Sequence, residues 1–184
     1  MFTSIKPRRL PIMGLIAVAA VGVALSVTTS GAGAQSASHR GGERLVVRGD
    51  DVVKDGPCQA GVCQLELTDG VFRGTPVGTG AYTGSFELGV AEAFPNGEGG
   101  VCAPIDGHIV LGAGSPDRLV LAVEGDSCQD GAGDVTAASF TGLARFVVEY
   151  GTGAYAKAKG HGLATFLEDA SDHERMTLIG RISR

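Results

Sequence analysis

The chain has 184 residues and a formal net charge of −5, a size that suits one domain built around one hydrophobic core. Its first 34 residues contain three basic side chains and no acidic one, so the rest carries a net charge of −8 (12 Lys and Arg against 20 Asp and Glu). A domain this acidic repels phosphate backbones and anionic lipids, so neither nucleic acid nor a membrane surface is expected as a partner.

Residues 1–34 predict a secretion signal. A basic start is followed by an apolar run over 12–27 and by an A-x-A sequence at 32–34, which is typical of cleavage before Gln35. The apolar run is short for a membrane span of about 20 residues, which favours cleavage over an uncleaved membrane anchor. We therefore expect a secreted, extracellular protein, in surroundings where disulfides persist.

The remainder of the chain predicts strands almost throughout. Residues 35–42 are polar and rich in Gly and Ser, and predict a flexible tail. From 43 to 184, short runs with period-two alternation recur between turn-forming residues, and no segment shows the apolar stripe of a helix. Strands are expected at 43–48, 62–68, 80–91, 105–112, 117–124, 139–149, 161–168 and 174–182.

Eight successive strands joined by short Gly-rich turns predict an all-β domain over 43–184, a single eight-stranded antiparallel barrel. Closure is favoured because it removes the exposed edges of the sheet. Glycines inside the strand patterns, such as Gly84, Gly142 and Gly162, support the barrel, since glycine permits sharp bends at barrel corners. A two-sheet β-sandwich is the alternative.

A five-residue sequence, Gly-Thr-Gly-Ala-Tyr, occurs at 78–82 and again at 151–155. No helix is predicted after either copy, so the helix N-terminus that a phosphate-binding glycine loop requires is missing. We expect each copy to form a tight turn with positive φ that leads into a strand with a buried tyrosine.

Four cysteines follow the signal, and an even number in a secreted chain predicts disulfides. Three pairings are possible, and the register of one hairpin selects among them. If the chain folds back around Ser115, apolar residues face apolar residues and Cys102 lies opposite Cys128. The expected bonds are therefore Cys102–Cys128 and Cys58–Cys63.

The residue types do not form a convergent catalytic or metal-binding set. There is no G-x-S-x-G motif and no C-x-x-C pair. His108 and Asp106 share a strand face, but an acid–base pair needs a buried cleft, and we expect this pair to be exposed. The acidic loop 125–134 spaces its carboxylates unlike an EF-hand. We predict no catalytic residue, cofactor or metal, and surface positions for His39, His161 and His173.

Several segments are similar to small secreted bacterial proteins with an allene oxide cyclase-like barrel, a superfamily that includes the plant dirigent proteins. The segments are FPNGEGGVCAP at 94–104, DRLVL at 117–121, GDSC at 125–128, FTG at 140–142 and GTGAY at 151–155. The resemblance covers about residues 78–168 and implies a lipocalin-like, eight-stranded antiparallel barrel. It implies no activity, because no catalytic residue of the plant cyclases can be placed on this chain and a lumen is not evidence for a reaction.

The expected binding site is the barrel lumen. Its candidate ligand-binding residues are Tyr82, Phe86, Leu88, Phe140, Phe146 and Phe166. Small residues on the same faces, such as Gly142 and Gly162, favour a narrow cavity. The leading hypothesis is a secreted, non-enzymatic barrel that binds a small apolar ligand or an extracellular protein.

Two other functions stay open. One is an allene oxide cyclase-like isomerase or cyclase acting in the lumen, which an ionisable residue beside an open mouth would favour. The other is a packed structural barrel that acts through its outer surface, which a lumen filled by side chains would favour. The sequence leaves the oligomeric state open.

Overall fold

The computed structural model describes residues 42–97, 99–129 and 140–184. The expected signal, the tail up to residue 41 and the acidic loop from residue 130 to 134 lie outside the described residues. No helix within the described ranges is long and apolar enough to cross a membrane.

The described residues form a nearly all-β fold. The strands are β1 (Glu43–Gln59), β2 (Val62–Thr75), β3 (Gly78–Leu88), β4 (Phe94–Pro95), β5 (Val101–Leu111), β6 (Leu119–Gln129), β7 (Phe140–Gly151), β8 (Lys159–Glu168) and β9 (His173–Ser183). Two short 3-10 helices, η1 (Val90–Glu92) and η2 (Gly153–Tyr155), lie between strands.

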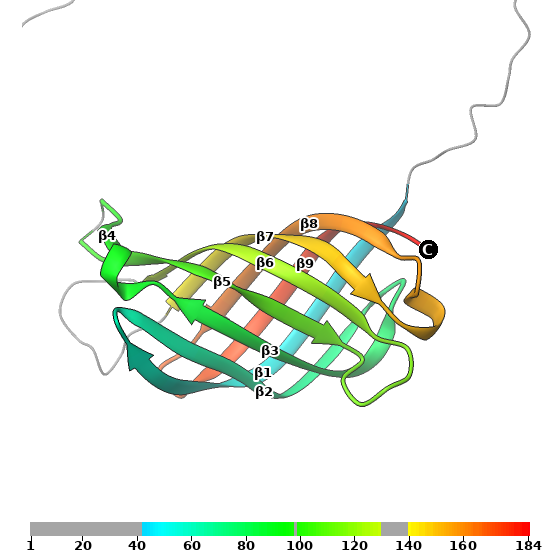
Figure 1. The fold of residues 1–184 in the computed structure, drawn as a ribbon, viewed down its shortest axis with the longest axis horizontal. Helices are drawn as coiled ribbons and strands as arrows, with labels where there is room; N and C mark the ends of the chain where they lie inside the picture. Colours follow the sequence, from blue (N-terminus) through cyan, green and yellow to red (C-terminus); the bar gives the residue numbers. More distant parts are fainter. Residues whose placement is uncertain (1–41, 98, 130–139) are drawn as a thin grey trace, which may run out of the picture. The chain divides into compact units, whose positions relative to one another are not determined.

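The predicted eight-stranded antiparallel barrel is confirmed, and the sandwich alternative is wrong. The sheet runs in the order β3-β2-β1-β9-β8-β7-β6-β5, and pairing of β3 with β5 closes it (Figure 1). The additional strand β4 pairs only with the start of β5. The first and last strands are neighbours, because Glu43 pairs with Ile182 and the Arg184 guanidinium lies 3.0 Å from the Glu43 carboxylate.

Strands β1 and β2 extend well beyond the segments predicted at 43–48 and 62–68. Two features explain the shorter prediction. On β2 a register shift between Leu67 and Gly70 interrupts the period-two pattern, because a bulge adds an unpaired residue. On β1 every second residue stays buried from Leu45 to Val53, but the acidic Asp51 holds one of these inward positions and ends the apolar pattern.

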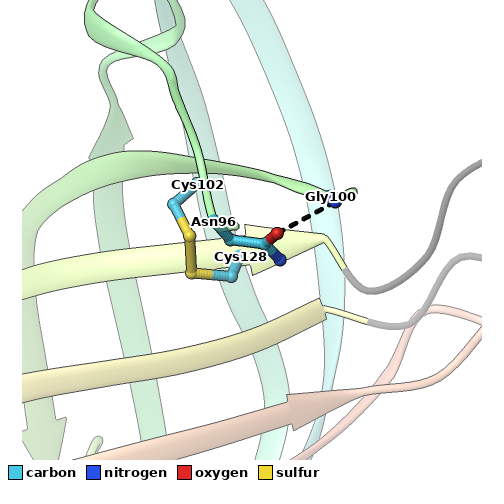
Figure 2. The surroundings of a disulfide bond; sticks show 4 residues. All are labelled: Asn96, Gly100, Cys102 and Cys128. Carbon is cyan, nitrogen blue, oxygen red and sulfur yellow. Dashed lines mark hydrogen bonds between the residues drawn. A yellow bond between two sulfur atoms is a disulfide. The ribbon is translucent and has the colours of Figure 1, made fainter. Parts of the chain in front are cut away.

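The predicted hairpin register and both disulfides are present. Strand β5 pairs with β6 with Ile109 opposite Leu121 and Cys102 opposite Cys128. The Cys102–Cys128 bond lies beside the short β4–β5 connection, where the Gly100 backbone N–H donates to Asn96 Oδ1 at 2.9 Å (Figure 2). The second disulfide, Cys58–Cys63, joins β1 to β2 at the same end of the barrel.

Rings that point into the barrel lie over glycines of neighbouring strands. Phe146 on β7 pairs with Gly162 on β8, which pairs with Gly180 on β9. A Cβ atom added to Gly162 or Gly180 would lie 2.6 or 2.8 Å from the Phe146 ring. In the same way, a Cβ atom added to Gly142 would lie 2.8 Å from the Phe166 ring. The space expected above Gly162 is therefore filled by a ring from the adjacent strand.

The two Gly-Thr-Gly-Ala-Tyr segments differ in structure. In the first, Gly78 has a φ of +77° and Tyr82 is buried in β3, as predicted. In the second, Gly153 has a φ of +54° but the segment forms η2, and Tyr155 is only partly buried. The prediction of a second strand start is wrong because Asp117 Oδ1 accepts the Ala154 N–H at 2.8 Å and holds the turn against the β5–β6 connection.

Candidate functional site

Three carboxyl side chains lie in one row across neighbouring strands. Asp51 on β1 pairs with Glu174 on β9, and Glu174 pairs with Glu168 on β8. Residues directly opposite each other in antiparallel strands share a face, with Cβ atoms about 4.5–5.5 Å apart. Asp51 is 4% and Glu174 8% exposed, whereas Glu168 is partly buried. We call these three residues the carboxyl row.

The carboxyl row has few hydrogen-bond donors. The Tyr82 hydroxyl of β3 donates to Asp51 Oδ2. Asp51 Oδ1 and Glu174 Oε1 are buried and have no hydrogen-bond partner among the described residues. A buried acceptor without a donor is costly, by about 1–3 kcal/mol for each group. The row therefore offers acceptor oxygens that the surrounding side chains leave unsatisfied.

Burial and mutual repulsion change the protonation of the row. Burial raises the pKa of Glu174 to about 9, and the charges of Asp51 and Glu168 add to this shift. Burial also raises the pKa of Glu168 to about 7. Asp51 has a pKa of about 6, because burial outweighs the opposing hydrogen bond from Tyr82. At neutral pH, Glu174 thus holds a proton while its two neighbours are close to their own titration points.

We expect the thermal midpoint of unfolding to fall as pH rises from about 5 to about 9. All three folded-state pKa values lie above the ordinary values of 3.8 and 4.5, so the folded state binds more protons than the unfolded state. The resulting stability is complete below the unfolded pKa values and is lost as pH rises through 6, 7 and 9. Calorimetry across this range measures the decline.

A matched pair of variants isolates the contribution of the row to this decline. Glu174→Gln removes one titrating group and should flatten the loss above neutral pH. Glu66→Gln, at an exposed position of β2, should leave the profile unchanged. A midpoint that depends on pH in the same way in wild type and Glu174→Gln would contradict the assignment.

Four further acids lie near the row and raise the pKa of its members by repulsion: Asp50, Asp55, Asp169 and Asp172.

A small recess opens inside the barrel next to the row. Its volume is about 40 Å³, and Glu168 and Glu174 supply its charged lining. The other lining residues are Val53, Leu65, Leu67, Phe86, Ile105, Ser127, Phe140, Gly142 and Phe166. The rings of Phe86 and Phe166 meet edge to face with centroids 5.7 Å apart. The recess thus combines an apolar aromatic wall with two carboxyl groups.

A larger groove adjoins the recess. It has a volume of about 400 Å³ and shares Phe140, Glu168 and Glu174 with the recess. Its remaining lining residues are Asp50, Thr141, Leu167, Asp169, His173 and Arg175. Two members of the carboxyl row therefore stand where the recess and the groove meet.

The structure divides the six predicted lumen residues into two groups. Phe86, Phe140 and Phe166 line the recess. Tyr82 and Phe146 are 1% exposed and form part of the packed interior, while Leu88 is partly buried against it. For Phe86, Phe140 and Phe166 a role in ligand binding stays a prediction. Tyr82, Leu88 and Phe146 do not line the recess.

No known protein family, curated protein or solved structure matches this chain. The resemblance to allene oxide cyclase-like barrels therefore stays a prediction. What the site can do must be argued from the carboxyl row, the recess and the groove alone.

The other candidate residues do not converge on a site. His108 lies on the outer surface, with Nε2 3.1 Å from Glu149 Oε2, and both side chains are about half exposed. Among the described residues, no group of three His, Cys, Asp or Glu side chains is placed to hold a metal ion. His161 and His173 are exposed, and His39 lies outside the described residues.

The carboxyl row was not predicted from the sequence, although strand parity contains the signal. Asp51 continues the inward series of Leu45 and Val47 on β1, and Glu174 precedes Met176 on the inward face of β9. The first predicted strand stopped at residue 48, before Asp51, and Glu168 and Glu174 stood at the ends of the strands predicted at 161–168 and 174–182. Extending the period-two pattern along β1, and to these two strand ends, would have placed the acids inside.

Proposed function

We propose that the protein is a secreted, non-enzymatic barrel that binds a small ligand with an apolar part at the recess. One observation supports this most directly: Phe86, Phe140 and Phe166 line an opening next to a groove, whereas Tyr82 and Phe146 pack without free space. Ligand sites combine an apolar lining with a few polar groups, and this is the composition of the recess.

The dimensions limit the ligand and the way it binds. The recess of about 40 Å³ is small, because about 10–15 Å³ measured in the same way is enough to hold one water molecule. The groove of about 400 Å³ lies within the usual range of about 300–1,000 Å³ for small-molecule sites. The ligand therefore places one end in the recess and the rest of its surface in the groove.

Two observations support an extracellular location. The two disulfides are compatible with it, because such bonds persist mainly in oxidising compartments. The signal-like segment 1–34 adds support from the sequence.

Binding at the recess is tested with benzyl alcohol, a small neutral aromatic probe. Titration followed by NMR should shift signals of Phe86, Phe140 and Phe166 before those of other residues. Phe140→Ala should weaken binding by about 5-fold or more, since one buried aromatic contact contributes about 1 kcal/mol or more. Val71→Ala, at a position 64% exposed on β2, should leave the affinity unchanged. Shifts confined to the outer surface would contradict the proposal and favour a barrel that acts through that surface.

A second candidate function is an isomerase that transfers protons at the recess. It is supported by one observation, the pKa of about 7 that burial gives to Glu168, because a general acid or base works best near the operating pH. If this function is correct, wild type accelerates the exchange of the α-protons of a small aromatic ketone with deuterated water, and Glu168→Gln does not. An equal rate for both proteins excludes it.

A further inference from the structure

We propose that the ligand carries a primary ammonium group, which Glu174 and Glu168 bind where the recess meets the groove. This inference rests on the proposed function, because it takes the recess as the binding site. It adds the chemical class of the ligand: a small organic cation with an apolar tail.

The first argument is the hydrogen-bonding state of Glu174. This side chain is 8% exposed, lines both the recess and the groove, and has a buried Oε1 without a hydrogen-bond partner among the described residues. An ammonium group has three donors and no acceptor. It therefore supplies donors for the carboxyl group of Glu174, which has an unpartnered oxygen, and brings no acceptor that would stay unpaired.

The second argument is charge. Within the part of the chain that the structure describes, no basic side chain lines the recess. The groove has Arg175 and His173, but its acids outnumber them: Asp50, Glu168, Asp169 and Glu174. A cleft lined mainly by one sign of charge concentrates ligands of the opposite sign. Anionic ligands are disfavoured, and a neutral ligand would leave the carboxyl charges uncompensated.

The third argument concerns the shape of the cation. The described residues contain no set of three ligating side chains that could hold a metal ion, which favours an organic cation. The phenylalanine rings of the recess attract a cation placed over their faces. A primary ammonium has three N–H donors for the carboxyl oxygens, whereas a trimethylammonium group has none. These features select a primary amine whose apolar part lies against the phenylalanine rings of the recess.

Ammonium binding is coupled to proton release. Because burial raises the pKa of Glu174 to about 9, the free protein holds a proton on this carboxyl at pH 8. The bound ammonium stabilises the carboxylate, so one proton leaves Glu174 for the solvent as the amine binds. The charges of Asp51 and Glu168 raise the pKa of Glu174 and so oppose this proton loss, but they also attract the ammonium group. Affinity for the amine should therefore be lower at pH 6 than at pH 8.

The test compares benzylamine with benzyl alcohol by isothermal titration calorimetry at pH 8, in buffers of different ionisation enthalpy. Wild type should bind the amine at least about 10-fold more tightly than the alcohol, as expected for a hydrogen-bonded charge pair, and release up to about one proton. Glu174→Gln should abolish proton release and lower this preference several-fold, because Glu168 alone then carries a charge for the ammonium to pair with. Glu66→Gln should behave as wild type.

The outcomes separate the two proposals. If neither probe binds, the proposed function fails. If the alcohol binds as tightly as the amine, or if Glu174→Gln keeps the preference, the cation inference is overturned while the proposed function stands. If Glu174→Gln does not fold, the affinity of wild type for benzyltrimethylammonium is measured instead. This probe retains the charge but has no N–H donor. Binding of this probe as tight as that of benzylamine overturns the assignment to a primary ammonium.

Discussion

Phe146→Ala is expected to lower the free energy of unfolding by about 3–5 kcal/mol. The Phe146 ring is 1% exposed and fills the space above Gly162 and Gly180 on the two adjacent strands. Glycine has no side chain that could move into the vacated volume, so the cavity left by the ring stays largely open. Urea denaturation of wild type and variant measures the loss.

A control on the same strand separates packing from strand propensity. Val147, the next residue, is 53% exposed on the outer face, and Val147→Ala should cost no more than about 0.5–1 kcal/mol. A loss below about 1 kcal/mol for Phe146→Ala would show that the interior around the ring is loosely packed. The site of ligand binding would then need to be sought there as well as at the recess.

Removing the Cys102–Cys128 bond with the double substitution Cys102→Ala/Cys128→Ala should cost roughly 3–4 kcal/mol. The bond closes a segment with a sequence separation of 26 residues, and in the chain-entropy model a longer loop restricts the unfolded chain more strongly. The change is measured by urea denaturation of the purified double variant.

The second disulfide provides a matched comparison. Cys58 and Cys63 are 5 residues apart, so Cys58→Ala/Cys63→Ala should cost only about 2 kcal/mol in the same model. The ranking of the two double variants is the informative result. A greater loss from the short loop than from the long one would mean that native packing around Cys58, rather than loop length, determines the effect.

The sequence predicts the barrel because its strand pattern is local. On β5 and β6 the alternation of Ile109 and Leu111 with polar or small residues suffices to set a register, and that register brings Cys102 to Cys128. Each step requires only residues within one hairpin, and the structure confirms it. The Gly78 turn and the burial of Tyr82 follow from equally short segments.

The recess could be predicted only in part. Phe86, Phe140 and Phe166 were expected inside, but the sequence does not show that Phe146 fills the volume of Gly162, because this depends on register between β7 and β8. The carboxyl row depends on three strands at once. Asp51 keeps the inward parity of Leu45 and Val47, but it lies beyond the strand predicted at 43–48 and is acidic, so the apolar pattern does not reveal it.

The pairing of β1 with β9 makes the barrel suitable for circular permutation. Glu43 lies opposite Ile182, and Arg184 reaches the Glu43 carboxylate at 3.0 Å, so a short Gly/Ser linker can join residue 184 to residue 43. New chain ends can be opened in the β5–β6 turn. Both changes fall at the end of the barrel opposite the carboxyl row, because β9 begins near the row and ends beside the start of β1. A reporter domain attached there would leave the groove accessible, which would convert the protein into a sensor for its ligand.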